Sequence, residues 1–194
     1  MRYVLASGSP RRKELLAKVV PGFEIIPAVS EEDSHESEPS RIVEELSFQK
    51  ASEIFHKILT DRDGGLVVIG ADTVVSYNHR VLGKPAGPDE AFEMVKMLQG
   101  QTHSVFTGVT LFFMENNDIK HVTFSECTSV HVCSMSDQEI RSYVDSGEPL
   151  DKAGAYGIQG LFGKFITGIE GDYYNVMGLP VARLYKELKD NSLL

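Results

Sequence analysis

A short motif near the N-terminus combines residue types that bind phosphate. Residues 7–12 read Ser-Gly-Ser-Pro-Arg-Arg and directly follow a short apolar stretch. Ser9 and Pro10 are typical of a helix start, where free backbone N–H groups and the positive end of the helix dipole favour an anion. Arg11 and Arg12 would add charge-assisted hydrogen bonds. The alternative is a capped helix with solvated arginines, and the motif lacks the long loop and Gly-Lys-Ser/Thr ending of a P-loop.

A carboxylate follows a second apolar stretch. Asp72 and Thr73 come shortly after Leu66–Ile69, a run that is apolar on both faces and typical of a central strand. Open α/β sheets place their ligand chemistry at the carboxyl ends of such strands. There Asp72 would hold a divalent cation or accept a proton from water. The alternative is a turn aspartate that caps a bend.

Two lysines and a glycine-rich segment complete the candidates. Lys50 lies at the edge of an apolar helical face, and Lys84 lies between a glycine and a proline. Each lysine taken alone is typical of a side chain that covers apolar surface and keeps its charge in water. Residues 146–160 read SGEPLDKAGAYGIQG, which favours a loop whose backbone approaches a ligand over a core element. A plain surface loop is the alternative.

The elements that must position these residues alternate between strand-like and helix-like patterns, which predicts an α/β fold. The expected strands are Tyr3–Ala6, Phe23–Pro27, Leu66–Ile69, Val74–Tyr77, Val81–Leu82, Val105–Met114 and His121–Cys133. The expected helices cover residues 9–20, 39–59, 88–98, 137–144 and 180–188, and residues 146–178 are rich in glycine. Neither a repeat nor an interdomain linker is visible, so we expect a single domain over residues 1–194.

Composition narrows the class of protein. A chain of 194 residues that is 42% hydrophobic is long enough for one globular core. A net charge of −9 argues against binding to nucleic acid, which needs a basic face, although a few focused cations can still bind a polyphosphate. The longest apolar runs fall far short of the ~20 residues that span a membrane, and the N-terminus resembles no signal peptide. With two cysteines there is no disulfide framework, so we expect a cytoplasmic protein.

These pieces, in this order, resemble the Maf family of nucleotide pyrophosphatases. The matching stretches are SGSPRR (7–12), GADTVV (70–75), GKP (83–85), LQGQTHSVFTGV (98–109), SGEPLDKAGAYGIQG (146–160) and GDYYNVMGLP (171–180). They cover nearly the whole chain, and the string DKAGAYGIQG makes the resemblance specific. It implies a mixed, twisted α/β sheet with flanking helices and two lobes around a cleft, similar to inosine triphosphate pyrophosphatases. It also implies cleavage of a nucleoside triphosphate between the α- and β-phosphates with a divalent cation, Mg²⁺ or alternatively Mn²⁺.

By this resemblance, four charged residues carry out or support the reaction. Asp72 corresponds to the family's proposed proton acceptor, and Glu32, Lys50 and Lys84 correspond to charged residues that line the cleft. We predict that Asp72, Lys84 and Glu32 are catalytic, that Asp72 and Glu32 are metal ligands, and that Lys50 binds substrate. Because Asp72 cannot fully serve as both a tight ligand and a free base, its role stays open.

The remaining positions carried over from the family bind substrate. Ser9 and Arg12 correspond to residues that contact the substrate in the first loop, and Arg11, Thr73 and Gln159 to residues linked to base choice. The Ala-Tyr-Gly-Ile-Gln sequence resembles the branch that acts on dTTP and UTP rather than the branch that prefers 7-methyl-GTP. The amide of Gln159 has a donor and an acceptor, which suits the carbonyl–NH–carbonyl edge of thymine or uracil.

Other functions compete with this one. A modified pyrimidine nucleotide or CTP would keep the chemistry and change the base. A nucleotide-binding regulator of cell division or septum formation would bind without turnover, but it would have no need of Asp72 to activate water. A homodimer is an expectation from the resemblance alone.

Overall fold

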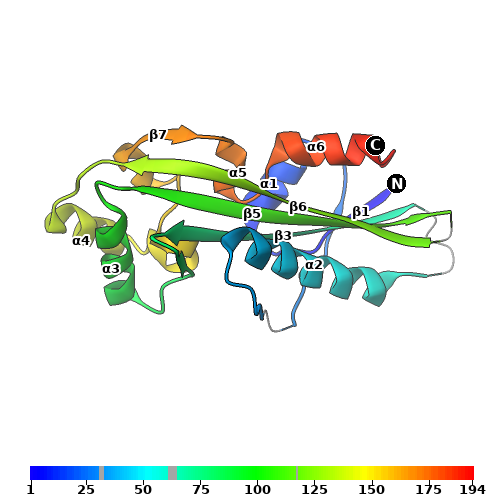
Figure 1. Cartoon of the computed structure of the whole chain (residues 1–194), viewed down its shortest axis with the longest axis horizontal. Coiled ribbons are helices and arrows are strands. Elements are labelled where there is room, and N and C mark those ends of the chain that lie inside the picture. The colour runs from blue at the N-terminus through cyan, green and yellow to red at the C-terminus, as the bar shows by residue number, and fades with distance from the viewer. Residues whose placement is uncertain (31–32, 61–64, 117) are drawn as a thin grey trace. The chain divides into compact units, whose positions relative to one another are not determined.

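The computed structural model describes residues 1–30, 33–60, 65–116 and 118–194. Within them the strands form a seven-stranded mixed sheet in the order β2-β1-β3-β5-β6-β7, with β4 paired to β3 (Figure 1). The strands are β1 (Arg2–Leu5), β2 (Glu24–Ile25), β3 (Leu66–Tyr77), β4 (Arg80–Leu82), β5 (Thr102–Glu115), β6 (Asp118–Val132) and β7 (Ile166–Glu170). The helices are α1 (Pro10–Leu16), α2 (Pro39–Ile58), α3 (Pro88–Leu98), α4 (Asp137–Asp145), α5 (Tyr173–Met177) and α6 (Val181–Asp190).

The chain divides into two compact units. Each of the long strands β3, β5 and β6 has residues in both units. Unit 1 comprises Met1–Asp72, Thr107–Glu126 and Gly178–Leu194, and unit 2 comprises Thr73–Phe106 and Cys127–Met177. The expected α/β class, mixed sheet and flanking helices are confirmed. The single domain and the cleft between lobes stay predictions. Among the described residues, no helix is both long and apolar enough to cross a membrane.

Unit 1 is a parallel β1–β3 pair covered by helices on both faces. Leu5 of β1 is in register with Ile69 of β3. Helix α2 lies on one face, and α1 and α6 lie on the other (Figure 1). On the α2 side the buried side chains are Val4, Ala6, Ala51, Ile54, Phe55, Leu66, Val68 and Phe112. On the opposite face the Tyr3 hydroxyl donates a hydrogen bond to the Leu193 carbonyl at the end of the chain.

Helix α2 approaches the sheet closely because two glycines face it. A Cβ atom at Gly70 would lie 2.4 Å from the Ser47 carbonyl oxygen, and one at Gly108 would lie 2.2 Å from the Val43 carbonyl oxygen. The buried hydroxyl of Ser47 is 2.9 Å from that of Thr110, so the polar group in this interface is hydrogen-bonded. Only glycine fits at these two strand positions, which therefore set how close α2 lies to β3 and β5.

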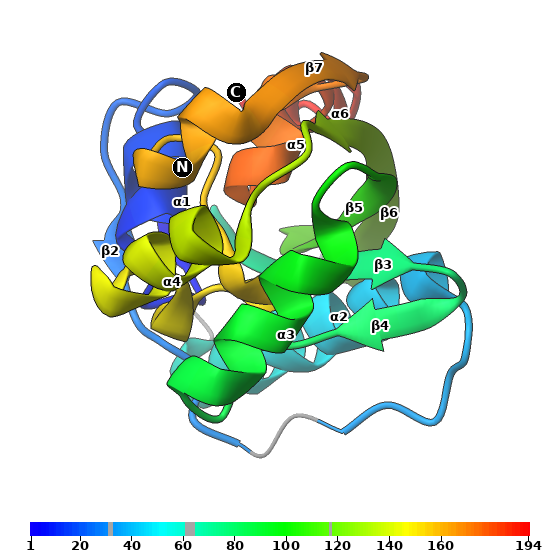
Figure 2. The same cartoon turned by 90° about the vertical axis from the view of Figure 1, so that its left-hand side faces the viewer.

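Unit 2 is built around an aromatic and aliphatic core. Helices α3 and α4 pack side by side (Figure 2). Phe162 belongs to the segment of residues 146–165, here called the late loop, and is fully buried in the same core. Strands β3 and β4 form the expected hairpin, in which Asn78 and His79 both have positive φ. This backbone favours the tight turns that match the twist of antiparallel strands.

A buried histidine joins β5 to the late loop of unit 2. The Nε2 atom of His103 lies 2.7 Å from the Tyr156 hydroxyl, and His103 is only 2% exposed. Burial lowers the pKa of His103 to about 4, with a smaller contribution from the charge of His131. The imidazole is therefore neutral at physiological pH and can accept a hydrogen bond from the Tyr156 hydroxyl.

Two expectations about the elements were wrong. Strand β3 does not end at Ile69 but continues to Tyr77, so Asp72 is a strand residue and not part of a turn. Helix α1 ends at Leu16 instead of near Val20. The segment of residues 146–160 contains two short 3₁₀ helices, η1 (Glu148–Asp151) and η2 (Ala153–Ala155), and a third, η3 (Leu161–Phe165), follows it.

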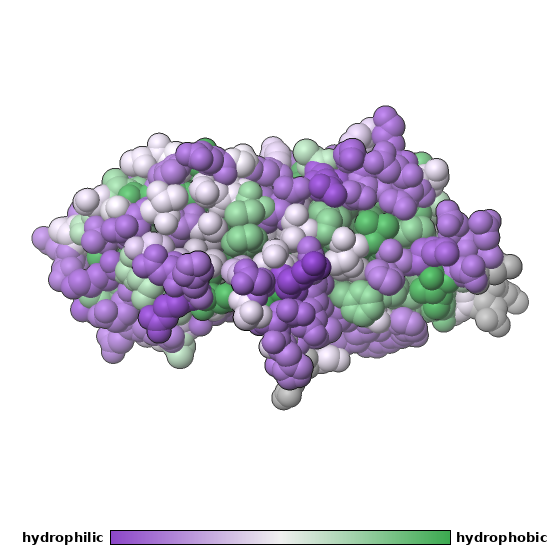
Figure 3. All heavy atoms as spheres, viewed as in Figure 1, coloured by the Kyte–Doolittle hydropathy of each residue, from purple (hydrophilic) through white to green (hydrophobic). Residues whose placement is uncertain are grey.

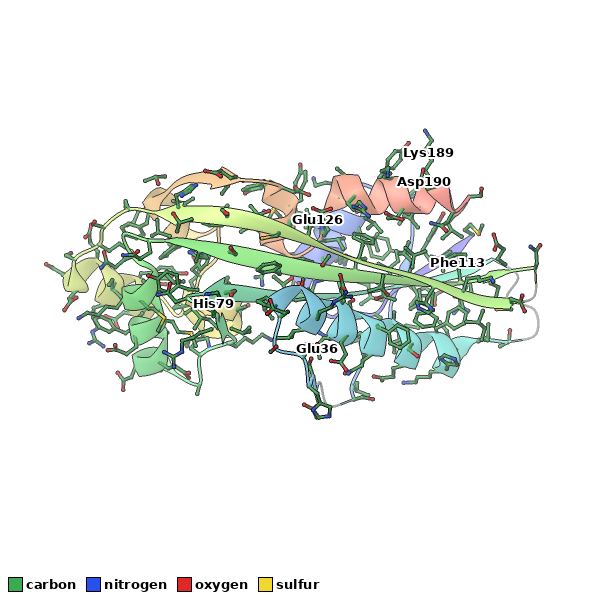
Figure 4. The ribbon with its side chains drawn as sticks, in the orientation of Figure 1. Glu36, His79, Phe113, Glu126, Lys189 and Asp190 are labelled. Carbon is green, nitrogen blue, oxygen red and sulfur yellow. The ribbon has the colours of Figure 1, made fainter. Side chains whose placement is uncertain are left out.

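The side chains on the surface are largely polar on the face shown in Figure 3, where apolar residues form small separate patches. On unit 1, Arg183 of α6 donates to Glu126 of β6, 3.4 Å away, while Lys189 and Asp190 at the end of the helix are exposed (Figure 4). Such exposed ion pairs contribute little to stability.

Replacing Gly108 by alanine tests the close approach of α2. The added Cβ would collide with backbone that cannot rotate away, so we expect the free energy of unfolding to fall by about 2–3 kcal/mol. Urea unfolding measures this change. The matched control is Gly22→Ala, whose Cβ would meet nothing within 4 Å; an equal effect of the two substitutions would contradict the packing described above.

Candidate active site

A buried ion pair joins α2 to β3. The Nζ atom of Lys50 lies 2.6 Å from Oδ1 of Asp72, and each side chain is 11% exposed. Asp72 follows the buried run Leu66–Ala71 within β3, so its carboxylate needs a partner that the neighbouring element supplies. Position 50 on α2 lies one turn from Ser47, which contacts Gly70. The pair therefore depends on the same close approach that Gly70 permits.

The loop after β1 lies beside this part of β3. The Ala6 N–H donates to the Ile69 carbonyl at 2.8 Å, so Ser7 and the residues that follow leave the sheet next to Gly70 and Ala71. Because β1 and β3 are parallel neighbours, the motif of residues 7–12 and the carboxylate of Asp72 both lie in the same region of unit 1. Strand β1 ends there, whereas β3 continues.

Arg12 is anchored within unit 1. Its Nη1 atom is 3.2 Å from the Ser7 hydroxyl and its Nε atom is 2.9 Å from the Gly178 carbonyl. Ser9 is the N-cap residue of α1, and its hydroxyl accepts from the Arg12 backbone N–H at 3.4 Å. Arg11 is half-buried. For Arg12 the alternative of a solvated arginine is therefore wrong, because two oxygen atoms hold the guanidinium.

Helix α1 adds less to anion binding than its sequence suggests. It has only seven residues, so its dipole is small, and the positive charge at its start comes mainly from the arginine side chains. Ser7 was not among the predicted site residues, although it lies in the same motif, is 8% exposed and accepts hydrogen bonds from Arg12 and from the Ser9 N–H. The Gly178 carbonyl was also missed, because its contact joins residues 166 positions apart.

The remaining predicted residues lie in unit 2. Thr73 follows Asp72 in β3 and is partly buried, whereas Lys84 and Gln159 are exposed. The Gly154 N–H donates to the Gly83 carbonyl at 3.0 Å, which brings the segment carrying Lys84 next to the late loop. The roles of these three residues stay predictions.

The described residues do not show which side chains would bind a metal ion. Glu32 lies outside the described residues, so its predicted roles as catalytic residue and metal ligand stay predictions. Among the residues that are described, no group of three His, Cys, Asp or Glu side chains is placed to hold a metal ion. Asp72 is the carboxylate of the site in the described part of the chain.

Fold and site together define an α/β protein in which a buried Lys–Asp pair lies on β3, and the loop that leads to the arginines of α1 leaves the neighbouring strand β1. The family model described as "Maf-like protein" matches residues 2–191. The chain therefore belongs to the Maf family.

Relatives of similar length support this assignment. The chain is 50% identical to the dTTP/UTP pyrophosphatase of Carboxydothermus hydrogenoformans, with 98% of each chain covered. It is 49% identical to the dTTP/UTP pyrophosphatase of Agathobacter rectalis, with 96% of this chain and 95% of the relative covered. Among solved structures, the Ham1 protein of Staphylococcus aureus is similar, with a TM-score of 0.53, 14% identity, and 98% of this chain and 100% of that chain covered. This last likeness shows the fold alone.

Removing Lys50 tests whether it neutralises a buried carboxylate. Lys50→Met would leave Asp72 without this partner, and we expect the free energy of unfolding to fall by about 2–4 kcal/mol. Adding Asp72→Asn to the Lys50→Met variant should recover at least half of that loss, because the unpaired charge disappears.

The control is Lys57→Met, which removes an exposed lysine from the same helix and should change stability by less than about 0.5 kcal/mol. Chemical unfolding of these four proteins and of the single variant Asp72→Asn at neutral pH gives these values. Independent, additive effects of the substitutions at positions 50 and 72 would argue against the pair.

Proposed function

We propose that this chain hydrolyses dTTP and UTP to the nucleoside monophosphate and pyrophosphate. The observation that carries the proposal is near-50% identity, over almost the full length of both chains, to relatives named dTTP/UTP pyrophosphatase. The residues of unit 1 described above supply the charges that this chemistry requires.

The triphosphate is bound by cations that are already fixed in place. Arg12 is held by Ser7 and Gly178, so little side-chain freedom is lost when it contacts a phosphate. Lys50 supplies a second charge at the same region of unit 1, and we assign Arg11 and Lys84 to further phosphate contacts. Charges placed in advance stabilise the negative charge that develops in the transition state.

The reaction adds one water molecule across a phosphoanhydride. The water oxygen bonds to the α-phosphorus, the bond from that phosphorus to the bridging oxygen breaks, and pyrophosphate leaves. One proton of the water passes to a base, for which we propose the carboxylate of Asp72. Lys50 holds Oδ1 of Asp72 and so fixes the orientation of the carboxylate toward the reacting water.

A carboxylate is the kind of ligand that a hard divalent cation requires. Mg²⁺ typically binds through one or two carboxylates, with substrate phosphates and water filling its other positions. We propose Glu32 as the carboxylate ligand, and Asp72 is the alternative ligand, in which case it does not act as the free base. Bound Mg²⁺, or Mn²⁺ in its place, would neutralise phosphate charge and lower the pKa of a coordinated water.

We assign base choice to Gln159, with Arg11 and Thr73. The exposed Gln159 amide can donate to a carbonyl of thymine or uracil and accept from the ring N–H. Cytosine presents an amino group and an unprotonated ring nitrogen at the corresponding atoms, so the same amide orientation would be mismatched. A homodimer and a cytoplasmic location stay predictions.

Pyrophosphate release from a panel of nucleoside triphosphates tests the proposal. In the presence of Mg²⁺ we expect release to be fastest from dTTP and UTP. EDTA should abolish release, and added Mg²⁺ or Mn²⁺ should restore it.

Release led by another nucleotide, such as CTP, would keep the chemistry and overturn the base assignment. No release from any member of the panel would contradict the proposal and favour a regulator that binds nucleotides without turnover. Release that is unaffected by EDTA would remove the cation from the account.

A further inference from the structure

Gln159 is presented by a tight turn in unit 2. The Gly160 N–H donates to the Gly157 carbonyl at 3.2 Å, which closes the turn between η2 and η3. The side chain of Gln159 is exposed. Because packing does not hold this side chain, its direction is set by the backbone of the turn.

A carboxylate holds the C-terminal side of this turn. Glu148 Oε2 accepts a hydrogen bond from the Leu161 backbone N–H at 2.8 Å. A Cβ atom at Gly160 would lie 2.2 Å from Glu148 Oε1 and 2.4 Å from Oε2, so the backbone rests directly on the carboxylate. The residue immediately after Gln159 must therefore be glycine for this contact to form.

A buried tyrosine holds the carboxylate of Glu148 in place. Tyr143 of α4 is 4% exposed, and its hydroxyl donates to Glu148 Oε1 at 3.1 Å. Burial and the negative charge of Glu148 raise the pKa of Tyr143 above its usual value, so the hydroxyl keeps the proton that it donates.

Tyr143 and Glu148 thus form a connected pair that pins the backbone on the C-terminal side of Gln159, at Gly160 and Leu161. Glu148 is itself fixed at its backbone, since its carbonyl accepts from Lys152 Nζ at 2.6 Å and its N–H donates to the Ser146 hydroxyl at 3.2 Å. Nothing in the proposed chemistry at the phosphates uses either residue.

We propose that Tyr143 and Glu148 are positioning residues that set the direction of Gln159 and thereby the preference for thymine and uracil over cytosine. The inference rests on the proposed function. A glutamine amide contributes to base choice only when its side chain reaches the base from a defined position, and the backbone of the turn sets that position. The pair acts by restricting the turn, without contacting the nucleotide.

The test compares hydrolysis of dTTP and dCTP by the full-length chain and its variants. Tyr143→Phe removes the hydrogen bond from the hydroxyl to Glu148, and Glu148→Gln removes the charge and one acceptor. In both variants we expect the ratio of kcat/KM for dTTP to that for dCTP to fall by about tenfold. The loss should appear mainly as a higher KM for dTTP, with kcat changed less.

Matched controls and a double variant distinguish positioning from general damage. Tyr185→Phe on α6 and Glu93→Gln on α3 change exposed residues of the same types and should leave the ratio unchanged. Gln159→Ala should also lower the ratio. If Tyr143 acts through Gln159, the double variant Tyr143→Phe/Gln159→Ala should have the same ratio as Gln159→Ala alone.

Amide hydrogen exchange measures the restraint without relying on activity. The Leu161 N–H group should exchange faster in Tyr143→Phe and Glu148→Gln, while protection in β1 and β3 is unchanged. If Tyr143→Phe fails to fold, Glu148→Gln carries the test.

The failures are separable. A wild-type chain that releases no pyrophosphate overturns the proposed function and the inference with it. A wild-type chain that prefers dTTP, with variants that keep its ratio or lose kcat equally for both nucleotides, overturns the positioning role and leaves the proposed function standing.

Discussion

Asp72 is a carboxylate in a buried strand, and that constraint accounts for much of unit 1. A buried charge requires a partner at hydrogen-bond distance, and Lys50 on α2 provides one at 2.6 Å. Lys50 reaches Asp72 because α2 lies directly on the strand, which Gly70 and Gly108 permit by having no Cβ where the helix backbone passes. The parallel pairing of β1 with β3 then places the loop that leads from β1 to α1 next to the same part of the sheet. The packing of α2 and the pairing of a buried charge therefore act at the same part of β3.

The constraint in unit 2 is different, because there an exposed side chain, that of Gln159, has to be held in a defined direction. Exposed glutamines normally sample several rotamers, so selectivity must come from the backbone that carries them. Here the turn that carries Gln159 is restrained by the hydrogen bond from the Leu161 N–H to Glu148, which Tyr143 holds in turn, and the neutral His103 holds Tyr156 three residues before Gln159. The glycines of this segment, which in the sequence suggest a close approach of the backbone to a ligand, allow the backbone to approach these side chains.

The sequence predicted local features of the fold better than contacts between distant residues. The N-cap at Ser9 and the start of α2 at Pro39 follow from residue preferences within a few positions, and both are confirmed. The extension of β3 through Asp72 was missed, because the polar residues and Gly70 resemble a strand end unless the packing of α2 is known. The Lys50–Asp72 and Arg12–Gly178 contacts join residues far apart in the chain, and periodicity holds no information about them. Most candidate residues were predicted from the family resemblance, and the residues that they contact are seen only in the structure.

The central claim is that Asp72 activates water and is not needed to bind the nucleotide. The most direct measurement compares Asp72→Asn with the wild-type chain, using dTTP for turnover and a non-hydrolysable analogue with a methylene bridge between the α- and β-phosphates for binding. The account predicts that turnover falls by about 10²–10⁴-fold while the dissociation constant of the analogue changes by only a few-fold. Turnover that persists at the wild-type level in Asp72→Asn would contradict it.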